Sequence, residues 1–311
     1  MSTGHKIRVV LRQATVIAST ILPREKSLRL ERYLRGREDS RMLRESDIAI
    51  VSYGKSGRTW LRVLLSRYYQ QHYNLPPGRL LIHDNLRSLN SAVPFIFFTH
   101  DNYLEDYAGT QNSKAPYADK PVILLVRHPA DTAVSQFFQW KHRMRSRKKF
   151  INDYPEGRKD LEPIDFVLDD KAGLPKIIRF MNLWASEFDA IKDIRVVRYE
   201  TLRQNTADTF GKILRFMNET PSADELAQCV EFASVENMRA MEKGTFFQDV
   251  GDRMKPGNVN NPDSYKVRRA KVGGYRDYFT EEQNAEIDRL IASTLSPAFG
   301  YSGQSPDPRV L

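Results

Sequence analysis

Four short apolar runs, separated by segments with helical spacing, constrain the fold more than any other feature of the sequence. The runs are Ile48–Tyr53, Phe95–Thr99, Val122–Val126 and Ile194–Arg198. They are rich in β-branched and aromatic residues, as buried strands tend to be. Between the first two runs, apolar residues from Leu61 to Tyr68 recur at i, i+3, i+4 and i+7, which is typical of a helix with one buried face. Because strands that alternate with helices form parallel sheets covered on both faces, we expect an α/β fold with a central, mainly parallel sheet flanked by helices.

The composition favours an anionic partner. The chain of 311 residues has 48 Lys and Arg against 39 Asp and Glu, which gives a formal net charge of +9. Such an excess suits phosphate esters, nucleic acid or a membrane surface, although solvated basic side chains that serve only solubility explain it equally well. Residues 141–163 and 244–274 combine basic residues with Gly, Asn and Pro, so we expect two long loops there.

Cysteine and histidine usage limits the chemistry. Cys229, the only cysteine, lies in an apolar helical pattern and is expected in the core, so neither a disulfide within the chain nor a cysteine metal site can form. Nothing calls for an oxidising compartment, and we expect a cytoplasmic location. The six histidines are scattered and lack the paired spacing of a metal site, so no metal is predicted.

The first 46 residues are expected to form a basic helical extension to one domain that covers residues 47–311. Apolar residues in the extension share a helical face: Ile7, Val10, Leu11, Ala14, Ile17, Ala18 and Ile21. Charges interrupt this apolar segment and no small-residue cleavage site follows, so it does not have the form of a signal peptide. Two interpretations stay open: a basic amphipathic helix that lies on a membrane surface, or a helix that packs on the core of its own domain.

Helix starts are marked by two capping boxes and a proline. The boxes are Ser222 with Glu225 and Thr280 with Gln283. Pro129 opens a third helix, because proline is favoured in the first turn.

The turn after the first apolar run, SYGKSGRTW at residues 52–60, is the stretch richest in chemistry. A strand, a glycine-containing turn and a helix N-terminus form an anion cradle, because backbone N–H groups converge there and the helix dipole favours negative charge. Lys55 adds a full positive charge, and Ser56 and Thr59 add hydroxyl donors. The usual nucleotide-triphosphate loop has four residues between its first Gly and a Gly-Lys pair. Here Lys55 precedes Gly57 and the loop is shorter, which argues against kinases and NTPases.

SYGKSGRTW resembles the 5′-phosphosulfate-binding loop, Tyr-Pro-Lys-Ser-Gly-Thr-Thr-Trp, of the sulfotransferases that use 3′-phosphoadenosine 5′-phosphosulfate (PAPS) as sulfuryl donor. Gly54 stands in place of Pro, and Arg58 in place of the first Thr. The resemblance implies a P-loop-NTPase-like sulfotransferase fold and a PAPS-dependent enzyme whose product is adenosine 3′,5′-bisphosphate (PAP). It places the donor against these residues: Lys55, Ser56, Gly57, Arg58, Thr59 and Trp60.

A second block, VRHPADTAVSQ at residues 126–136, is similar to the family's 3′-phosphate segment, Arg-(Asn/His/Asp)-Pro-x-Asp-x-x-x-Ser. Arg127 ends a strand and Ser135 lies about two turns into the next helix. An arginine can hold a terminal phosphate through two parallel hydrogen bonds, and a serine hydroxyl can donate beside it. This block therefore supplies the second anion-binding half of the predicted donor site.

A third block, RRAKVGGYRDYFT at residues 268–280, resembles Arg-Lys-Gly-x-x-Gly-Asp-Trp-x-x-x-Phe-Thr and places Arg268, Arg269 and Ala270 at the 3′-phosphate. Ala270 replaces Gly, which weakens the case for a close backbone contact there. Gly274 and Tyr275 replace Asp and Trp.

The adenine side of the predicted donor site has weaker sequence matches to the family. VVRYETL resembles the family's Tyr-Glu-(Asp)-Leu segment and places Tyr199 near the base. Trp60 either stacks on the adenine or packs in the core as one residue of an amphipathic helix. Ala233 stands where the family more usually has Thr, so one hydrogen bond to the base is expected to be missing.

The implied reaction moves a sulfuryl group to an acceptor hydroxyl or amine, with Lys55 at the bridging oxygen where leaving-group charge develops. His100 follows the second apolar run, at the strand end where ligands bind in open parallel sheets. It matches the family's catalytic histidine in Lys-Thr-His, and imidazole suits a general base near neutral pH. Phe98 replaces that lysine, so one cationic contact to the sulfuryl group is absent. No essential metal is expected.

Two alternatives belong to other classes. A kinase-like phosphotransferase needs ATP and a carboxylate that holds magnesium, and none of the predicted strands ends in an acidic residue. A basic membrane- or nucleic-acid-binding protein could use the cations between Lys141 and Lys149, but only Trp140 and Phe150 flank them and none is interleaved for base stacking, so nucleic acid is not expected as a partner. An alcohol, a glycan and a lipid headgroup all stay open as acceptors, as does the oligomeric state.

Overall fold

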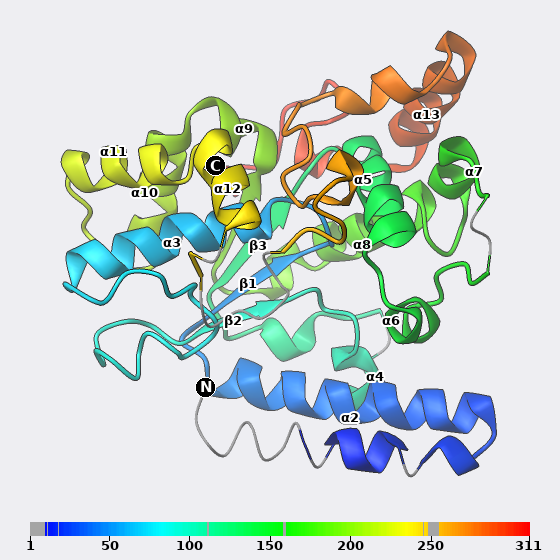
Figure 1. Ribbon diagram of the computed structural model, residues 1–311, viewed down its shortest axis with the longest axis horizontal. Coiled ribbons are helices and arrows are strands. Elements are labelled where there is room, and N and C mark those ends of the chain that lie inside the picture. The colour runs from blue at the N-terminus through cyan, green and yellow to red at the C-terminus, as the bar shows by residue number, and fades with distance from the viewer. Residues whose placement is uncertain are drawn as a thin grey trace.

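The computed structural model describes residues 10, 12–17, 19–110, 112–157, 160–244, 246–247 and 255–311. Its sheet contains β1 (Ile48–Ser52), β2 (Ile96–Thr99), β3 (Val122–Val126) and β4 (Ile194–Arg198). β3 and β4 have the predicted bounds, β1 ends one residue early and β2 begins one residue late. The strand order is β2-β1-β3-β4 and each neighbouring pair is parallel, which confirms the predicted α/β fold (Figure 1).

Helices flank this sheet. They are α2 (Arg24–Glu45), α3 (Arg58–His72), α4 (Leu104–Ala108), α5 (Pro129–His142), α6 (Ser146–Ile151), α7 (Pro163–Leu168), α8 (Leu174–Ser186), α9 (Tyr199–Gln204), α10 (Thr206–Phe216), α11 (Ala223–Phe232), α12 (Val235–Lys243) and α13 (Glu281–Thr294). α5 begins at Pro129 as predicted, and both predicted capping boxes form at the starts of α11 and α13.

The sheet has a hydrophobic core on each face, because successive strand residues point to opposite sides. Ile48 and Ile50 of β1 face a core with α3, α10 and α11. Ala49 and Val51 face a second core with α5, α8 and α13. Cys229 is fully buried in the first core, as expected. Burial on both faces explains why all five residues of β1 and of β3 are buried.

The long helix α2 lies across one end of the molecule and packs on α4 (Figure 1). The contact is unusually close at Gly36, where a Cβ atom would lie 2.1 Å from the carbonyl oxygen of Tyr103. Glu31 is buried on α2 and accepts a hydrogen bond from Arg35 at 2.7 Å as well as pairing with Arg147 of α6. α2 therefore docks through a glycine and buried charges. The division of the chain after residue 46 stays a prediction.

Only part of the predicted N-terminal apolar face can be placed. Ile7, Leu11 and Ala18 lie outside the described residues. Val10, Ile17 and Ile21 are exposed, so these three do not pack on the core of the domain. In the part of the chain that the structure describes, we find no helix long and apolar enough to cross a bilayer.

The predicted loop at 141–163 is wrong in part. α5 continues to His142, and α6 follows after three residues. The reason is local packing: Met144 is buried in an aromatic cluster with Trp140, and Ile151 is buried at the end of α6. Within the described part of 244–274, the chain forms a 3-10 turn at Pro262–Ser264 and no α-helix or strand, which agrees with the predicted loop.

Candidate functional site

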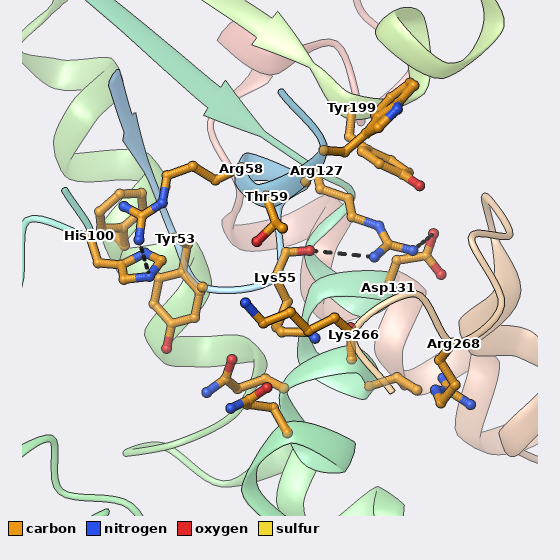
Figure 2. Close-up of a pocket in the computed structure, with 18 of the residues that line it drawn as sticks. Tyr53, Lys55, Arg58, Thr59, His100, Arg127, Asp131, Tyr199, Lys266 and Arg268 are labelled. Atoms are coloured by element: carbon orange, nitrogen blue, oxygen red, sulfur yellow. Dashed lines mark hydrogen bonds and ion pairs between the residues drawn. The ribbon is translucent and has the colours of Figure 1, made fainter. Parts of the chain in front are cut away.

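A cavity of about 740 Å³ lies beyond the carboxyl ends of the strands (Figure 2). It brings together almost all of the predicted site residues: Lys55, Gly57, Arg58, Thr59, Trp60, His100, Arg127, Ser135, Tyr199, Arg268, Arg269 and Ala270. Ser56 does not line the cavity and is buried beneath the turn. Residues from all four strand ends and from the C-terminal loop therefore meet in one place.

The turn after β1 adopts the tight geometry that its glycines suggest. Lys55 has φ 73° and Gly57 has φ 97°, so both lie in the left-handed region. Gly57 precedes the first residue of α3, and a Cβ atom there would lie 2.6 Å from the ring of Tyr199. Position 57 therefore requires glycine for two reasons, backbone conformation and close approach. The helix N-terminus that follows points its backbone N–H groups towards the cavity end of the turn.

The Lys55 side chain lies among other cations. The pKa of Lys55 is lowered to about 7, mainly by burial and then by the nearby guanidinium groups of Arg143, Arg127 and Arg268, against the opposing effect of Glu242. Burial likewise holds the pKa of Lys266 well below its usual range, with Arg143 and Lys55 adding to the effect. Because neighbouring cations add to the effect of burial at both lysines, positive charge is concentrated here and favours an anionic ligand.

Arg127 connects the turn to the C-terminal loop. Its Nη1 donates to the carbonyl oxygen of Lys55 at 3.4 Å, and its Nη2 lies 3.6 Å from a carboxylate oxygen of Asp131 (Figure 2). Nη2 also donates to the carbonyl oxygen of Lys271 at 3.2 Å. Its guanidinium lies over the ring of Tyr199, 4.7 Å from the centroid. Ser135 lies on α5, which begins two residues after Arg127, and lines the same cavity. The two anion-binding blocks that the sequence predicts therefore face each other.

Two carboxylates that the sequence analysis gave no role hold the C-terminal loop against the cavity. Asp131 accepts hydrogen bonds from the backbone N–H groups of Gly273 at 2.8 Å and Tyr275 at 2.9 Å. Asp131 belongs to the Arg-x-Pro-x-Asp pattern, so the motif itself was a signal for it.

Glu242, at the end of α12, is the second of these carboxylates and is fully buried. It accepts from the N–H groups of Lys266 at 2.6 Å and Val267 at 3.0 Å, and from Arg143 at 2.9 Å. No sequence pattern marks Glu242, because its partners are Arg143, which caps the end of α5, and a loop more than twenty residues further on.

The basic pair of the C-terminal loop is held mainly by aromatic and acidic neighbours. The guanidinium of Arg268 lies 3.8 Å from the centroid of the Phe138 ring and contacts the Tyr278 hydroxyl. Arg269 pairs with Asp277. Ala270 has φ 53°, a conformation that favours glycine, which is the residue that the family pattern has at this position.

Trp60 and Tyr199 form the aromatic end of the cavity. Their rings meet edge to face with centroids 5.8 Å apart, and both residues line the cavity. The indole N–H of Trp60 donates to the carbonyl oxygen of Ala233 at 2.9 Å. Ala233 therefore fixes the orientation of Trp60 through its backbone, a contact that does not depend on its side chain.

His100 is held in one tautomer by two hydrogen bonds. Its Nδ1 donates to the carbonyl oxygen of Ser52 at 2.8 Å, and its Nε2 accepts from Nη2 of Arg58 at 2.6 Å (Figure 2). A carbonyl can only accept and a guanidinium can only donate, so the ring is neutral with its proton on Nδ1. Burial, followed by the charge of Arg58, holds the pKa of His100 well below its usual range. Phe98, the departure from the family pattern, lies buried with the guanidinium of Arg62 4.1 Å from its ring centroid.

The part of the cavity wall near His100 was not predicted. We call it the polar wall and define it by these residues: Arg32, Asn102, Tyr103, Lys148, Asn152, Asp153, Tyr154 and Lys176. Arg32 of α2 donates to the carbonyl oxygen of Ile151 at 2.8 Å and pairs with Asp153 at 2.6 Å. Lys176 of α8 donates to the carbonyl oxygen of Asn152 at 2.8 Å. The basic segment 141–149 was the one sequence signal for this region, through Lys148.

Among the described residues, no group of three or more His, Cys, Asp or Glu side chains is arranged to hold a metal ion. The cationic groups around Lys55 are the positive charges that the cavity offers to a ligand.

Comparison with known proteins agrees with this geometry. The sequence matches the sulfotransferase domain family over residues 45–298. Amine sulfotransferase of Oryctolagus cuniculus is 23% identical over 265 residues, which cover 81% of this chain and 82% of the relative. Human sulfotransferase 2A1 is 23% identical over 282 residues, which cover 85% of this chain and 89% of the relative.

Solved structures with the same fold are also sulfotransferases and their relatives. Mouse sulfotransferase SULT7A1 complexed with PAP superimposes with a TM-score of 0.52 at 20% identity, covering 83% of this chain and 89% of that one. Retinol dehydratase in complex with androsterone and PAP gives a TM-score of 0.51 at 17% identity, covering 80% of each chain. At such low identity these likenesses concern the fold. The family match covers most of the chain, and the chain therefore belongs to the sulfotransferase domain family and is an enzyme of the sulfuryl-transfer class.

Proposed function

We propose that this sulfotransferase binds PAPS in the cavity, with its 5′-phosphosulfate at the Lys55 turn and its 3′-phosphate at Arg127, and transfers the sulfuryl group to a hydroxyl or amine of a small molecule. The observation that carries the proposal is the contact between the two anion-binding blocks, in which Arg127 donates to the Lys55 carbonyl at 3.4 Å. The contact places the Arg127 guanidinium beside the turn that carries Lys55, and two cationic residues on one cavity suit a ligand with an anion at both ends. The PAP complexes of mouse SULT7A1 and retinol dehydratase support the choice of donor.

Each predicted residue then has a physical role. Lys55, Thr59 and the N–H groups of Ser56, Gly57 and Arg58 bind the 5′ end, and Arg127, Ser135, Arg268, Arg269 and the backbone of Ala270 bind the 3′-phosphate. Trp60 and Tyr199 flank the adenine, where aromatic faces offer stacking area. The fit is supported by the depressed pKa of Lys55, because an anion beside it relieves the repulsion from neighbouring cations.

The reaction needs little more from the protein than charge and position. PAPS supplies a sulfuryl group on a mixed anhydride. His100 takes the proton of the acceptor hydroxyl as the acceptor oxygen bonds to sulfur. Lys55 stabilises the electron pair that stays on the 5′-phosphate oxygen when the bridging S–O bond breaks. The neutral state of His100 supports its role as base, because only the neutral ring can take a proton.

The polar wall narrows the range of acceptor molecules that suit the cavity. Androsterone and retinol are small molecules bound by retinol dehydratase, and they support a small-molecule acceptor here. The wall next to His100 offers two amides, two phenol hydroxyls, the carboxylate of Asp153 and the cations Arg32, Lys148 and Lys176. We propose an alcohol with further polar groups around the reacting hydroxyl, such as a sugar or a lipid headgroup, because a polar acceptor can exchange hydrogen bonds with such a wall and a hydrocarbon cannot.

The cellular location of the protein is a separate proposal. We propose a cytoplasmic enzyme, supported by relatives named cytosolic sulfotransferases. Peripheral membrane contact through the N-terminal segment also stays a proposal, supported by the exposed Val10, Ile17 and Ile21. Co-sedimentation with anionic lipid vesicles tests it, and loss of the protein from the vesicle pellet after Ile17→Ser and Ile21→Ser is the expected result.

Calorimetry with three nucleotides tests the donor. The expected result is micromolar or tighter binding of PAP, much weaker binding of adenosine 5′-phosphosulfate, which lacks the 3′-phosphate, and weaker binding of ATP. A screen for labelled sulfuryl transfer across acceptor classes follows, with Lys55→Ala and His100→Ala each expected to lower the rate by about a hundredfold or more. Lys212→Ala, a change to a half-exposed lysine of α10 outside the cavity, is the matched control. Tight binding of ATP but not of PAP would instead favour a phosphotransferase.

A further inference from the structure

We propose that Arg58 binds the sulfuryl group during transfer, and that in the absence of donor it covers the lone pair of the catalytic base. The inference rests on the proposed function and extends it to a residue at which this chain departs from the family loop. It assigns to Arg58 the cationic contact that Phe98 cannot make.

The guanidinium of Arg58 lies against the ring nitrogen of His100 that would act as the base. Nη2 of Arg58 lies 2.6 Å from Nε2 of His100, while Nδ1 of His100 is committed to the Ser52 carbonyl at 2.8 Å. Nε2 is therefore the only ring nitrogen that can take the acceptor's proton, and Arg58 occupies its lone pair. The acceptor hydroxyl must approach within hydrogen-bond distance of the same atom. Arg58 thus stands at the place where the acceptor oxygen and the sulfur have to meet.

This chain has no lysine at position 98. Where the family often has lysine, Phe98 is buried, 5% exposed, with Arg62 stacked on its ring at 4.1 Å. Arg58 and Arg62 are one turn apart on α3, so both project from the same face of the helix towards this corner of the cavity. A cation on helix α3, Arg58, therefore takes the place of the lysine that the family often has at the position of Phe98 on β2.

The His100 ring and a bound sulfuryl group compete for the Arg58 guanidinium. In the free protein Arg58 donates to a neutral imidazole, and the sulfuryl oxygens of a bound donor are anionic. Coulomb attraction adds to the hydrogen bond only with the anionic acceptor, so the guanidinium binds that acceptor more strongly. Arg58 therefore turns from His100 to the sulfuryl group when the donor binds, which exposes Nε2 only in the complex that can react. In the absence of donor, the covered lone pair cannot deprotonate an acceptor.

Binding of PAPS and PAP to the same variants tests the proposal, because the two ligands differ only in the sulfuryl group. In Arg58→Thr, which restores the family residue, and in Arg58→Ala, the Kd for PAPS is expected to rise about tenfold or more relative to the Kd for PAP. Arg203→Ala is the matched control, since Arg203 lines the same cavity near Trp60 and is expected to affect both ligands equally. Adding Phe98→Lys to Arg58→Thr is expected to restore the preference for PAPS.

Nitrogen NMR of labelled histidine gives an independent readout. The His100 resonance, assigned with His100→Gln, is expected to shift at Nε2 on addition of PAPS and much less on addition of PAP. Equal weakening of PAPS and PAP in both Arg58 variants would overturn the proposal and make Arg58 an ordinary phosphate ligand. So would an Nε2 shift of the same size with PAP as with PAPS. Failure of the unmodified protein to bind either nucleotide overturns the proposed function itself, which separates the two failures.

Discussion

The two ends of the cavity are built in different ways. The donor end, around Lys55 and Arg127, takes its side chains from short contiguous blocks that directly follow strands. The polar wall takes its side chains from α2, α6, α8, the residues just before α4 and the chain around residue 152, several of which are far apart in sequence. Anion binding at a strand end needs only backbone N–H groups and one or two cations at set spacing, so it leaves a local pattern. Recognition of an acceptor depends on how whole helices pack, so it leaves no local pattern in the sequence.

The largest expected effect falls on a donor-end residue that no motif marks. Glu242→Gln removes the charge that faces Arg143 and presents an amide N–H₂ group to a backbone N–H. Breaking a buried ion pair of this kind costs about 3 kcal/mol of unfolding free energy. Urea denaturation measures it, and Glu236→Gln on the exposed side of the same helix is expected to change stability by less than about 0.5 kcal/mol. Equal effects of the two substitutions would contradict the role given to Glu242.

Two single substitutions, one at each end of the cavity, compare how much the donor end and the polar wall contribute to PAP binding. Arg127→Ala is expected to weaken PAP binding about a hundredfold, because a desolvated phosphate loses its charged partner. Lys176→Ala, which removes a cation of the polar wall, is expected to change the Kd of PAP by less than about threefold. Titration calorimetry provides both values. A comparable loss in the two variants would mean that the ends are not separate sites.

The pH dependence of PAP binding sharpens the account of the donor end. An anion raises the pKa of Lys55 above its value of about 7 in the free protein, so binding takes up a proton. The affinity for PAP is therefore expected to be highest near or below pH 7 and to fall by up to about tenfold per pH unit above it. Calorimetry at pH 8 in two buffers of different ionisation enthalpy counts the protons. Lys55→Met is the control and should show a smaller proton uptake, with Lys266 as the remaining source.

The smallest effect concerns the backbone of the C-terminal loop. Ala270→Gly relieves a side chain held at φ 53°, and this gain slightly exceeds the added entropy of the unfolded chain. We expect a rise of about 0.5 kcal/mol in unfolding free energy. Ala240→Gly, in the exposed middle of α12, should lower it by about 1 kcal/mol. Destabilisation by both changes would show that Ala270 is not strained.

Some elements could be predicted to the residue and others not at all. The bounds of β3 and β4 follow from apolar runs, and the starts of α11 and α13 follow from capping boxes, because in each case neighbours in sequence supply the whole signal. α2 shows no apolar stripe: its buried positions include Ser27, Glu31 and Gly36. Ser27 contacts Ser19, Glu31 pairs with Arg147 of α6, and Gly36 packs on the start of α4. α6 was predicted as loop because six cations lie between Lys141 and Lys149, three of them in α6, while the burial of Ile151 decides its packing.

The sequence by itself determined the alternation of strands and helices, the tight turn at Lys55 and Gly57, and the chemical character of the donor end, since backbone geometry and residue type act there over only a few positions. Tertiary structure alone decided that Arg58 reaches His100, that Glu242 holds the C-terminal loop and that α2 contributes Arg32 to the cavity. The reason is that these contacts join elements separated by tens of residues, and only the packing of helices on both faces of the sheet brings such partners within hydrogen-bond distance.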